Sequence, residues 1–185
     1  MELMFFGFKS SLALPFRNTD RQYGLIARLL HWSSVSLLVV VIYISGLFEN
    51  LPSGDVREDL VRLHSSFGIV LLLIMVSRLI WRRSNLNPIH SYNIHPLQKF
   101  SALLLHRLIY IVLIVLSLFG FGILLFSGGA IYLFDFELIS FMAKQESLNE
   151  FSIYVHSWVS VLIYPLFALH IFAAIYHQIF GVLDE

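Results

Sequence analysis

Four long apolar runs, separated by polar segments, dominate the pattern of the sequence. Residues 29–48 and 151–180 contain no Asp, Glu, Lys or Arg. Each run is long enough for a helix to cross about 30 Å of hydrocarbon. Two further apolar runs, at about 61–81 and 103–126, carry only one or two charges each. The pattern predicts an all-α fold, a transmembrane four-helix bundle forming a single domain over residues 1–185.

The connections between these runs differ in character. Residues 49–59 are polar and contain the turn formers of a Pro-Ser-Gly sequence, and residues 84–101 are polar with two prolines. The third connection, 127–150, places several phenylalanines among acidic residues. For that segment we expect either a short helix lying flat at the membrane interface or an irregular loop.

The distribution of basic residues predicts the orientation of the bundle. Cytoplasmic segments of membrane proteins are enriched in Lys and Arg. Nine bases lie in the N-terminal arm, the second connection and their flanks, whereas the other two connections and their flanks hold only three. The nine are Lys9, Arg17, Arg21, Arg28, Arg78, Arg82, Arg83, Lys99 and Arg107, and the three are Arg57, Arg62 and Lys144. We therefore expect both termini to be cytoplasmic, in a multi-pass protein of the bacterial inner membrane.

Composition supports a membrane location and narrows the chemistry. Hydrophobic residues make up 58% of the 185 residues and charged residues 13%, about half of the roughly 25% that is usual in soluble domains. The net charge of zero suggests no nucleic-acid partner. The absence of cysteine excludes disulfides, thiolate-ligated clusters and covalent c-type haem attachment.

The fourth apolar run carries three histidines, although ionisable side chains are costly at membrane depth and usually mark function. His156, His170 and His177 are separated by 14 and 7 residues, which places them on one stripe of a helix. His156 and His170 lie about 21 Å apart along the helix axis. One metal ion cannot join them, so the spacing indicates two sites at different depths.

Histidines on other runs match these two depths. His31 would pair with His170 toward the cytoplasmic side, and His64 with His156 toward the outer side. Facing imidazoles in a four-helix bundle can ligate the iron of a b-type haem. Non-haem metal sites on helices would need histidines three or four residues apart, and the spans contain no such pair. The pattern favours two non-covalent b-type haems.

Four further residues are candidates for contacts with haem propionates or a quinone. Arg78 and Arg107 are either anchors at the cytoplasmic interface or partners of carboxylates, which a guanidinium binds in a bidentate manner. His106 and His177 lie near the cytoplasmic surface, where either interfacial placement or a functional role is expected. No nucleophile motif or nucleotide-binding fingerprint is present.

As a whole, the chain resembles the prokaryotic cytochrome b561 family from about Tyr23 onward. The resemblance rests on His31-Trp32 at the start of the first span, His64 at the start of the second, and the RLIWRR sequence of residues 78–83. His106 and the three histidines of the fourth span complete it. It implies two b-type haems ligated by His31, His64, His156 and His170, and quinone exchange on one side of the membrane.

The resemblance leaves several activities open. Some members of the family resemble superoxide oxidases, which pass an electron from superoxide at the outer face to ubiquinone; others serve dehydrogenases or hydrogenases as cytochrome subunits. A site that collects an anion should be positively charged. Here the outer connections hold eight acids against three bases, which counts against superoxide, although Arg57 or Arg62 could form a local positive spot. A haem-free transporter or assembly protein is the alternative of another class, and whether the chain is itself an enzyme stays open.

Overall fold

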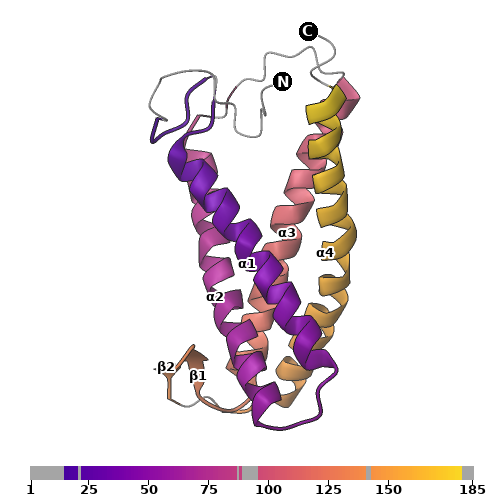
Figure 1. Ribbon diagram of the computed structural model, residues 1–185. Helices are drawn as coiled ribbons and strands as arrows, with labels where there is room; N and C mark the ends of the chain where they lie inside the picture. Colours follow the sequence, from indigo (N-terminus) through magenta and orange to yellow (C-terminus); the bar gives the residue numbers. More distant parts are fainter. Residues whose placement is uncertain (1–14, 21, 87, 89–95, 141–142, 181–185) are drawn as a thin grey trace.

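Four helices form the computed structural model, which describes residues 15–20, 22–86, 88, 96–140 and 143–180. They are α1 (Leu25–Glu49), α2 (Asp55–Ser84), α3 (Pro96–Phe126) and α4 (Glu146–Phe180). Figure 1 shows them side by side along one long axis. All four are long and apolar enough to cross a membrane, by length and composition. The prediction of an all-α four-helix bundle is confirmed.

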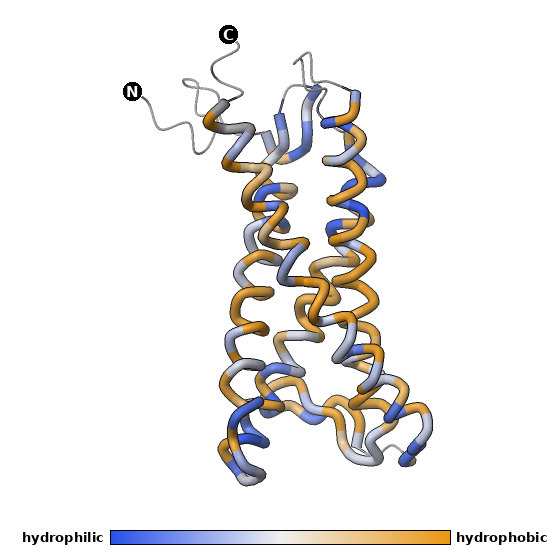
Figure 2. The backbone as a smooth tube through the Cα atoms, turned by 90° about the vertical axis from the view of Figure 1, so that its right-hand side faces the viewer, coloured by the Kyte–Doolittle hydropathy of each residue, from blue (hydrophilic) through white to orange (hydrophobic). Residues whose placement is uncertain are grey.

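The ends of the bundle are polar and its middle is apolar. Figure 2 shows hydrophobic residues along the length of the helices and hydrophilic residues gathered toward both ends. We call the end where α1 begins and α4 ends the terminal end, and the other the hairpin end (Figure 1). Many large apolar side chains point outward along the helices, as is appropriate for a surface that faces lipid rather than water.

The helices are longer than the apolar runs that predicted them. The first turn of α2 contains Asp55 and Glu58, and that of α4 contains Glu146. Negative side chains are favourable at a helix N-terminus because they face the positive end of the helix dipole. The apolar pattern therefore marks the part of each helix that lies in hydrocarbon, while the helix itself begins in the polar layer.

The connection between α3 and α4 forms a β-hairpin, so our expectation of a flat helix or an irregular loop was wrong. Strands β1 (Ile131–Leu133) and β2 (Phe136–Ile139) pair in antiparallel fashion. Both are rich in branched and aromatic residues, which favour strands. The turn between them includes Phe134, which adopts a φ of 54°.

Helix α2 holds this hairpin in place. The backbone N–H of Phe134 donates to the Ser66 hydroxyl at 2.7 Å, and the rings of Phe67 and Phe134 meet edge to face, with centres 5.1 Å apart. Ser66 is fully buried. These contacts seat the hairpin against α2 at the hairpin end of the bundle.

The core lies between the two ends and joins two helix pairs. Helix α1 packs mainly on α2 and α3 mainly on α4, while α2 and α3 link the pairs. The buried core consists of Leu38, Leu71, Met75, Val112, Leu113 and Ile163. The ends of the bundle, above and below this apolar layer, are where polar side chains from the two helix pairs meet.

Candidate haem-binding sites

Two histidine pairs bridge the helix pairs, one at each end of the bundle. At the terminal end, His31 of α1 faces His170 of α4, with ring centres 6.4 Å apart and ring planes at 65°. At the hairpin end, His64 of α2 faces His156 of α4, with ring centres 6.2 Å apart and planes at 81°. These are the two pairs that matching depths in the sequence predicted.

The separations fit a metal held between two imidazoles. An imidazole nitrogen binds a transition metal at about 2.0–2.1 Å, so two rings on opposite sides of one metal have centres roughly 6 Å apart. Both pairs have this spacing. No group of three or more His, Cys, Asp or Glu side chains within the described ranges is arranged to hold a single metal ion. The donor sets therefore suit a cofactor that needs one ligand on each face, as haem iron does.

The hairpin-end histidines are each oriented by a carbonyl from the neighbouring helix. The Nδ1 atom of His64 lies 3.1 Å from the Val41 carbonyl oxygen of α1. The Nδ1 atom of His156 lies 2.9 Å from the Leu116 carbonyl oxygen of α3. A carbonyl can only accept, so each Nδ1 carries the proton and each Nε2 has a free lone pair. This is the protonation state that a metal-ligating histidine requires.

Room for a flat cofactor exists beside His64. Gly68 lies one helical turn further along α2, and a Cβ added there would meet no atom within 4 Å. The open space is on the side of α2 that carries His64, because residues four apart share a helix face. Such space beside His64 would accommodate the edge of a porphyrin.

At the terminal end, a guanidinium takes the place of the carbonyl. Arg78 Nη2 lies 3.0 Å from His31 Nδ1, and Arg78 Nη1 donates to the Ser34 hydroxyl at 2.6 Å. The guanidinium also lies over the Tyr110 ring, 5.2 Å from its centre. Arginine has no acceptor, so the Nδ1 of His31 accepts here. Binding of iron by Nε2 of His31 therefore requires this contact to change.

A third imidazole belongs to the terminal-end cluster. The ring of His106, on α3, meets His170 edge to face with centres 5.1 Å apart, which is shorter than the spacing of the two facing pairs. Its Nδ1 donates to the Ala102 carbonyl at 2.6 Å. The sequence placed His106 at the same depth as His31 but gave no reason to pair it with His170. That shared depth was the signal from which the contact could have been found.

Among the described residues at the terminal end, the half-buried Arg78 guanidinium has only neutral acceptors, and one buried N–H has no acceptor. Among the described residues, Arg78 pairs with no carboxylate, and the Trp81 indole N–H is buried without a hydrogen-bond partner. Unpaired buried donors are costly. A haem bound at this end would bring carboxylates that such donors can bind, so the residues present fit the group.

Two predicted candidates remain, Arg107 and His177. The Arg107 side chain is exposed and makes no hydrogen bond or ion pair with the described residues. His177 lies within α4, but its side chain is outside the described part of the structure. His90 and His95 lie outside the described residues altogether. The structure thus brings six of the eight predicted site residues into contact with one another: the four paired histidines, Arg78 and His106.

An apolar four-helix bundle with facing imidazoles at two depths is the architecture of a membrane b-type cytochrome that transfers electrons. Comparison with known proteins agrees. The family model described as "Prokaryotic cytochrome b561" matches residues 22–184, and the chain belongs to this family. It is also similar to "Cytochrome b561 homolog 2" of Escherichia coli (strain K12), with 26% identity over 178 residues, covering 89% of each chain.

Family membership confirms the prediction of a multi-pass bacterial membrane protein that binds b-type haem and takes part in electron transfer. It gives no support to the alternative of a haem-free transporter or assembly protein.

Proposed function

We propose that this protein is a di-haem b-type cytochrome that carries electrons across the cytoplasmic membrane to or from a quinone. The observation that carries the proposal is the presence of one facing histidine pair at each end of the bundle. Each bound haem would supply reversible one-electron chemistry. The terminal end would face the cytoplasm, because the excess of Lys and Arg lies there.

The protein's own contribution is to hold, separate and shield the two sites. The Nε2 atoms of His64 and His156 are available as ligands at the hairpin end, and His31 and His170 are the ligands proposed at the terminal end. The two sites are about 21 Å apart along α4. The core between them includes Leu71 and Met75, which are almost fully buried. This apolar layer keeps water and ions from crossing with the electrons.

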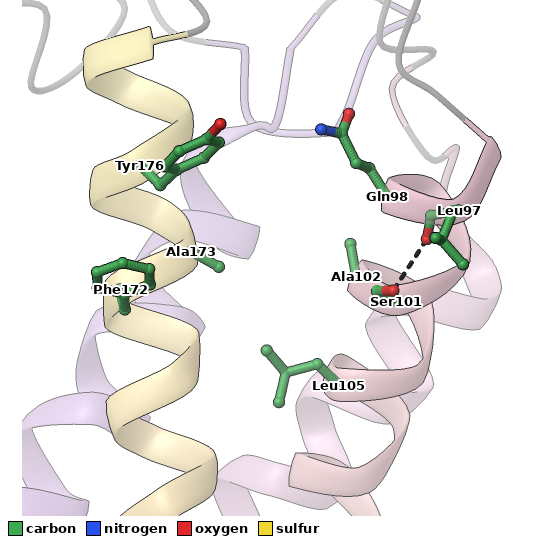
Figure 3. Close-up of a pocket in the computed structure, with 8 residues that line it drawn as sticks. All are labelled: Leu97, Gln98, Ser101, Ala102, Leu105, Phe172, Ala173 and Tyr176. Carbon is green, nitrogen blue, oxygen red and sulfur yellow. Dashed lines mark hydrogen bonds between the residues drawn. The ribbon is translucent and has the colours of Figure 1, made fainter.

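A cleft between α3 and α4 is the proposed quinone site. It has a volume of about 400 Å³ and is lined by Leu97, Gln98, Ser101, Ala102, Leu105, Phe172, Ala173 and Tyr176. Figure 3 shows Gln98 and Tyr176 on opposite sides of its mouth, with apolar side chains deeper in. A mostly apolar cleft with a few polar groups is typical of a site for an amphipathic small molecule.

The cleft is connected to the terminal-end histidines. Ala102 lines it, and the Ala102 carbonyl accepts the hydrogen bond from His106, whose ring contacts His170. A quinone in the cleft would thus be separated from a proposed iron ligand by one imidazole. His106 is exposed and can exchange protons with a quinone, whose reduction consumes them.

Transfer of electrons across a vesicle membrane tests the function. The protein is reconstituted into liposomes that contain ferricyanide, and a reductant that cannot cross the membrane is added outside. We expect ferricyanide to be reduced with the unmodified chain, and not with His64→Ala or His170→Ala, since each removes one site. Equal rates with and without the protein, or unchanged rates in both variants, would contradict the proposal.

Filling the cleft tests the quinone site separately. Ala102→Trp should leave the haem content unchanged but reduce the rate at which added quinol reduces the haems to the background rate. Leu104→Trp is the matched control, because Leu104 is 44% exposed on the same helix and does not line the cleft. A normal rate in Ala102→Trp would place the quinone elsewhere.

Superoxide is a candidate electron donor at the hairpin end, because a chain of side-chain contacts links an arginine to His64 there. The Arg57 guanidinium lies over the Phe48 ring, 5.8 Å from its centre, and Phe48 meets His64 edge to face with centres 5.4 Å apart. Arg62 is less suited, since it pairs with Asp59 at 3.6 Å. If superoxide is the donor, Arg57→Glu should slow haem reduction by superoxide without changing reduction by dithionite.

An electron-transfer subunit of a dehydrogenase or hydrogenase complex is the other candidate role. On the hairpin, the apolar side chains of Phe136 and Leu138 are 76% and 52% exposed, and Asp135 and Glu137 lie beside them. This combination suits a partner with a basic, partly apolar surface. Stable co-purification with a peripheral redox protein, lost on Phe136→Asp, would support this role.

A further inference from the structure

Helix α3 makes an unusually close contact with the His156 ring. The Leu116 carbonyl oxygen lies 2.9 Å from His156 Nδ1. One turn further along α3, Gly120 lies under the same edge of the ring: a Cβ built on Gly120 would be 3.0 Å from His156 Cε1 and 3.1 Å from Nδ1. Leu116 and Gly120 therefore form a seat for one edge of the imidazole.

This seat determines which nitrogen of the His156 ring has a lone pair free to bind a metal. The bond to Leu116 keeps the proton on Nδ1 and leaves the lone pair on Nε2. The ring can approach the carbonyl only because Gly120 has no side chain. A methyl group at 120 would press on Cε1 and Nδ1, the atoms nearest to the hydrogen bond, and would move the ring by a few tenths of an ångström.

We propose that Gly120 is a positioning residue for the hairpin-end haem, which fixes the direction and basicity of the His156 ligand through the Leu116 carbonyl. The proposal rests on the role proposed above for His156. A hydrogen bond from Nδ1 raises the basicity of a metal-bound imidazole, and stronger ligation of this kind stabilises ferric haem. Gly120 would thereby keep the potential of this haem low without contacting the haem itself.

A second glycine on α3 provides a matched control. A Cβ on Gly122 would lie 2.9 Å from the Ser152 hydroxyl oxygen of α4. Gly122→Ala therefore crowds the same helix pair to a similar extent, two residues away, but against a serine rather than a histidine. In a helix interior alanine is intrinsically favoured over glycine, so a harmful effect of either substitution arises from the contact and not from the backbone.

The test is a redox titration of the haem-loaded Gly120→Ala and Gly122→Ala proteins, with haem content measured in parallel. We expect Gly120→Ala to raise the midpoint potential of one haem, or to lose that haem, while the other is unchanged. Gly122→Ala should leave both potentials at their original values. Unchanged potentials in Gly120→Ala, or the same shift in both variants, would overturn the proposal.

His156→Ala separates this proposal from the one on which it rests. Two haems with unaltered potentials in His156→Ala would overturn the ligand assignment and the positioning role together. Loss of a haem in His156→Ala combined with normal potentials in Gly120→Ala would overturn the positioning role alone.

A measurement on the unmodified chain keeps the proposal testable if Gly120→Ala does not fold. In the reduced, diamagnetic protein labelled with carbonyl-¹³C leucine and ring-¹⁵N histidine, solid-state NMR can detect carbon–nitrogen proximity. We expect a close contact between a leucine carbonyl and a histidine Nδ1 that disappears in His156→Ala. A spectrum of the unmodified protein without any contact that depends on His156 would refute the proposed seat.

Discussion

The two histidine pairs have nearly the same spacing but opposite surroundings. At the hairpin end, His64 and His156 each direct Nδ1 to a backbone carbonyl of the adjacent helix. At the terminal end, His31 directs Nδ1 to the Arg78 guanidinium, and His170 contacts the additional imidazole of His106. The bundle geometry sets the distance between the two rings of each pair. The neighbouring residues determine whether Nδ1 of a ring donates or accepts a hydrogen bond.

This difference indicates that the imidazoles proposed as ligands at the hairpin end already have the protonation state that iron binding requires, whereas His31 at the terminal end needs a rearrangement. It also predicts different redox properties. Carbonyl acceptors strengthen ligation and favour ferric haem, whereas a nearby guanidinium favours the reduced form. We therefore expect the terminal-end haem to have the higher potential, which would draw electrons from the hairpin end toward the terminal end.

Removal of a proposed ligand should give the largest effect. His156→Ala and His170→Ala each delete one imidazole from a different pair, so each should lose one of two haems. The pyridine haemochrome assay on purified protein measures this loss. The two variants should also retain different haems, with the higher-potential haem remaining in His156→Ala. Retention of both haems in either variant would refute that ligand assignment.

Replacement of Arg78 should have an intermediate effect, confined to the terminal end. Arg78→Met removes a positive charge and the contact with His31 but keeps a long side chain. We expect the higher of the two potentials to fall by roughly 50 mV, close to the 59 mV that corresponds to a tenfold change for one electron. Arg107→Met is the control: this exposed arginine lies on the same side of the membrane but outside the cluster. A shift of the lower potential instead would show that the two ends are assigned in reverse.

Replacement of His106 should have the smallest effect on the haems. His106→Phe keeps a ring against His170 and removes only the nitrogens, so both haems should be retained with nearly unchanged absorption spectra. Quinol-driven reduction should be slower, because the group between the cleft and His170 can no longer exchange protons. If the absorption spectrum instead shows that His106→Phe has lost a haem, then His106 rather than His31 is the second iron ligand opposite His170.

The sequence predicted those features that depend on periodicity. Apolar runs gave the four helices, and the 14-residue separation of His156 and His170 gave the two depths. Contacts between side chains of different helices were not predictable in this way. Arg78 could be interpreted as an interfacial anchor, and nothing in the pattern showed that it would reach His31.

The sequence pattern also could not predict where two helices approach each other closely. Gly120 lies in an apolar run where glycine is common, and only the packing of α3 on α4 shows that it adjoins His156. The hairpin was missed because its strands have only three and four residues, too few for an alternating pattern to stand out. Its position depends on Ser66, a residue 68 positions away from its partner Phe134.

The central claim, that the chain holds one haem at each end, is tested most directly by the ratio of haem to protein in the unmodified, purified protein. The pyridine haemochrome assay, combined with amino-acid analysis of the same sample, gives this ratio. The two facing pairs predict two b-type haems per chain. A ratio of one haem or none in fully haem-supplied cells would contradict the account.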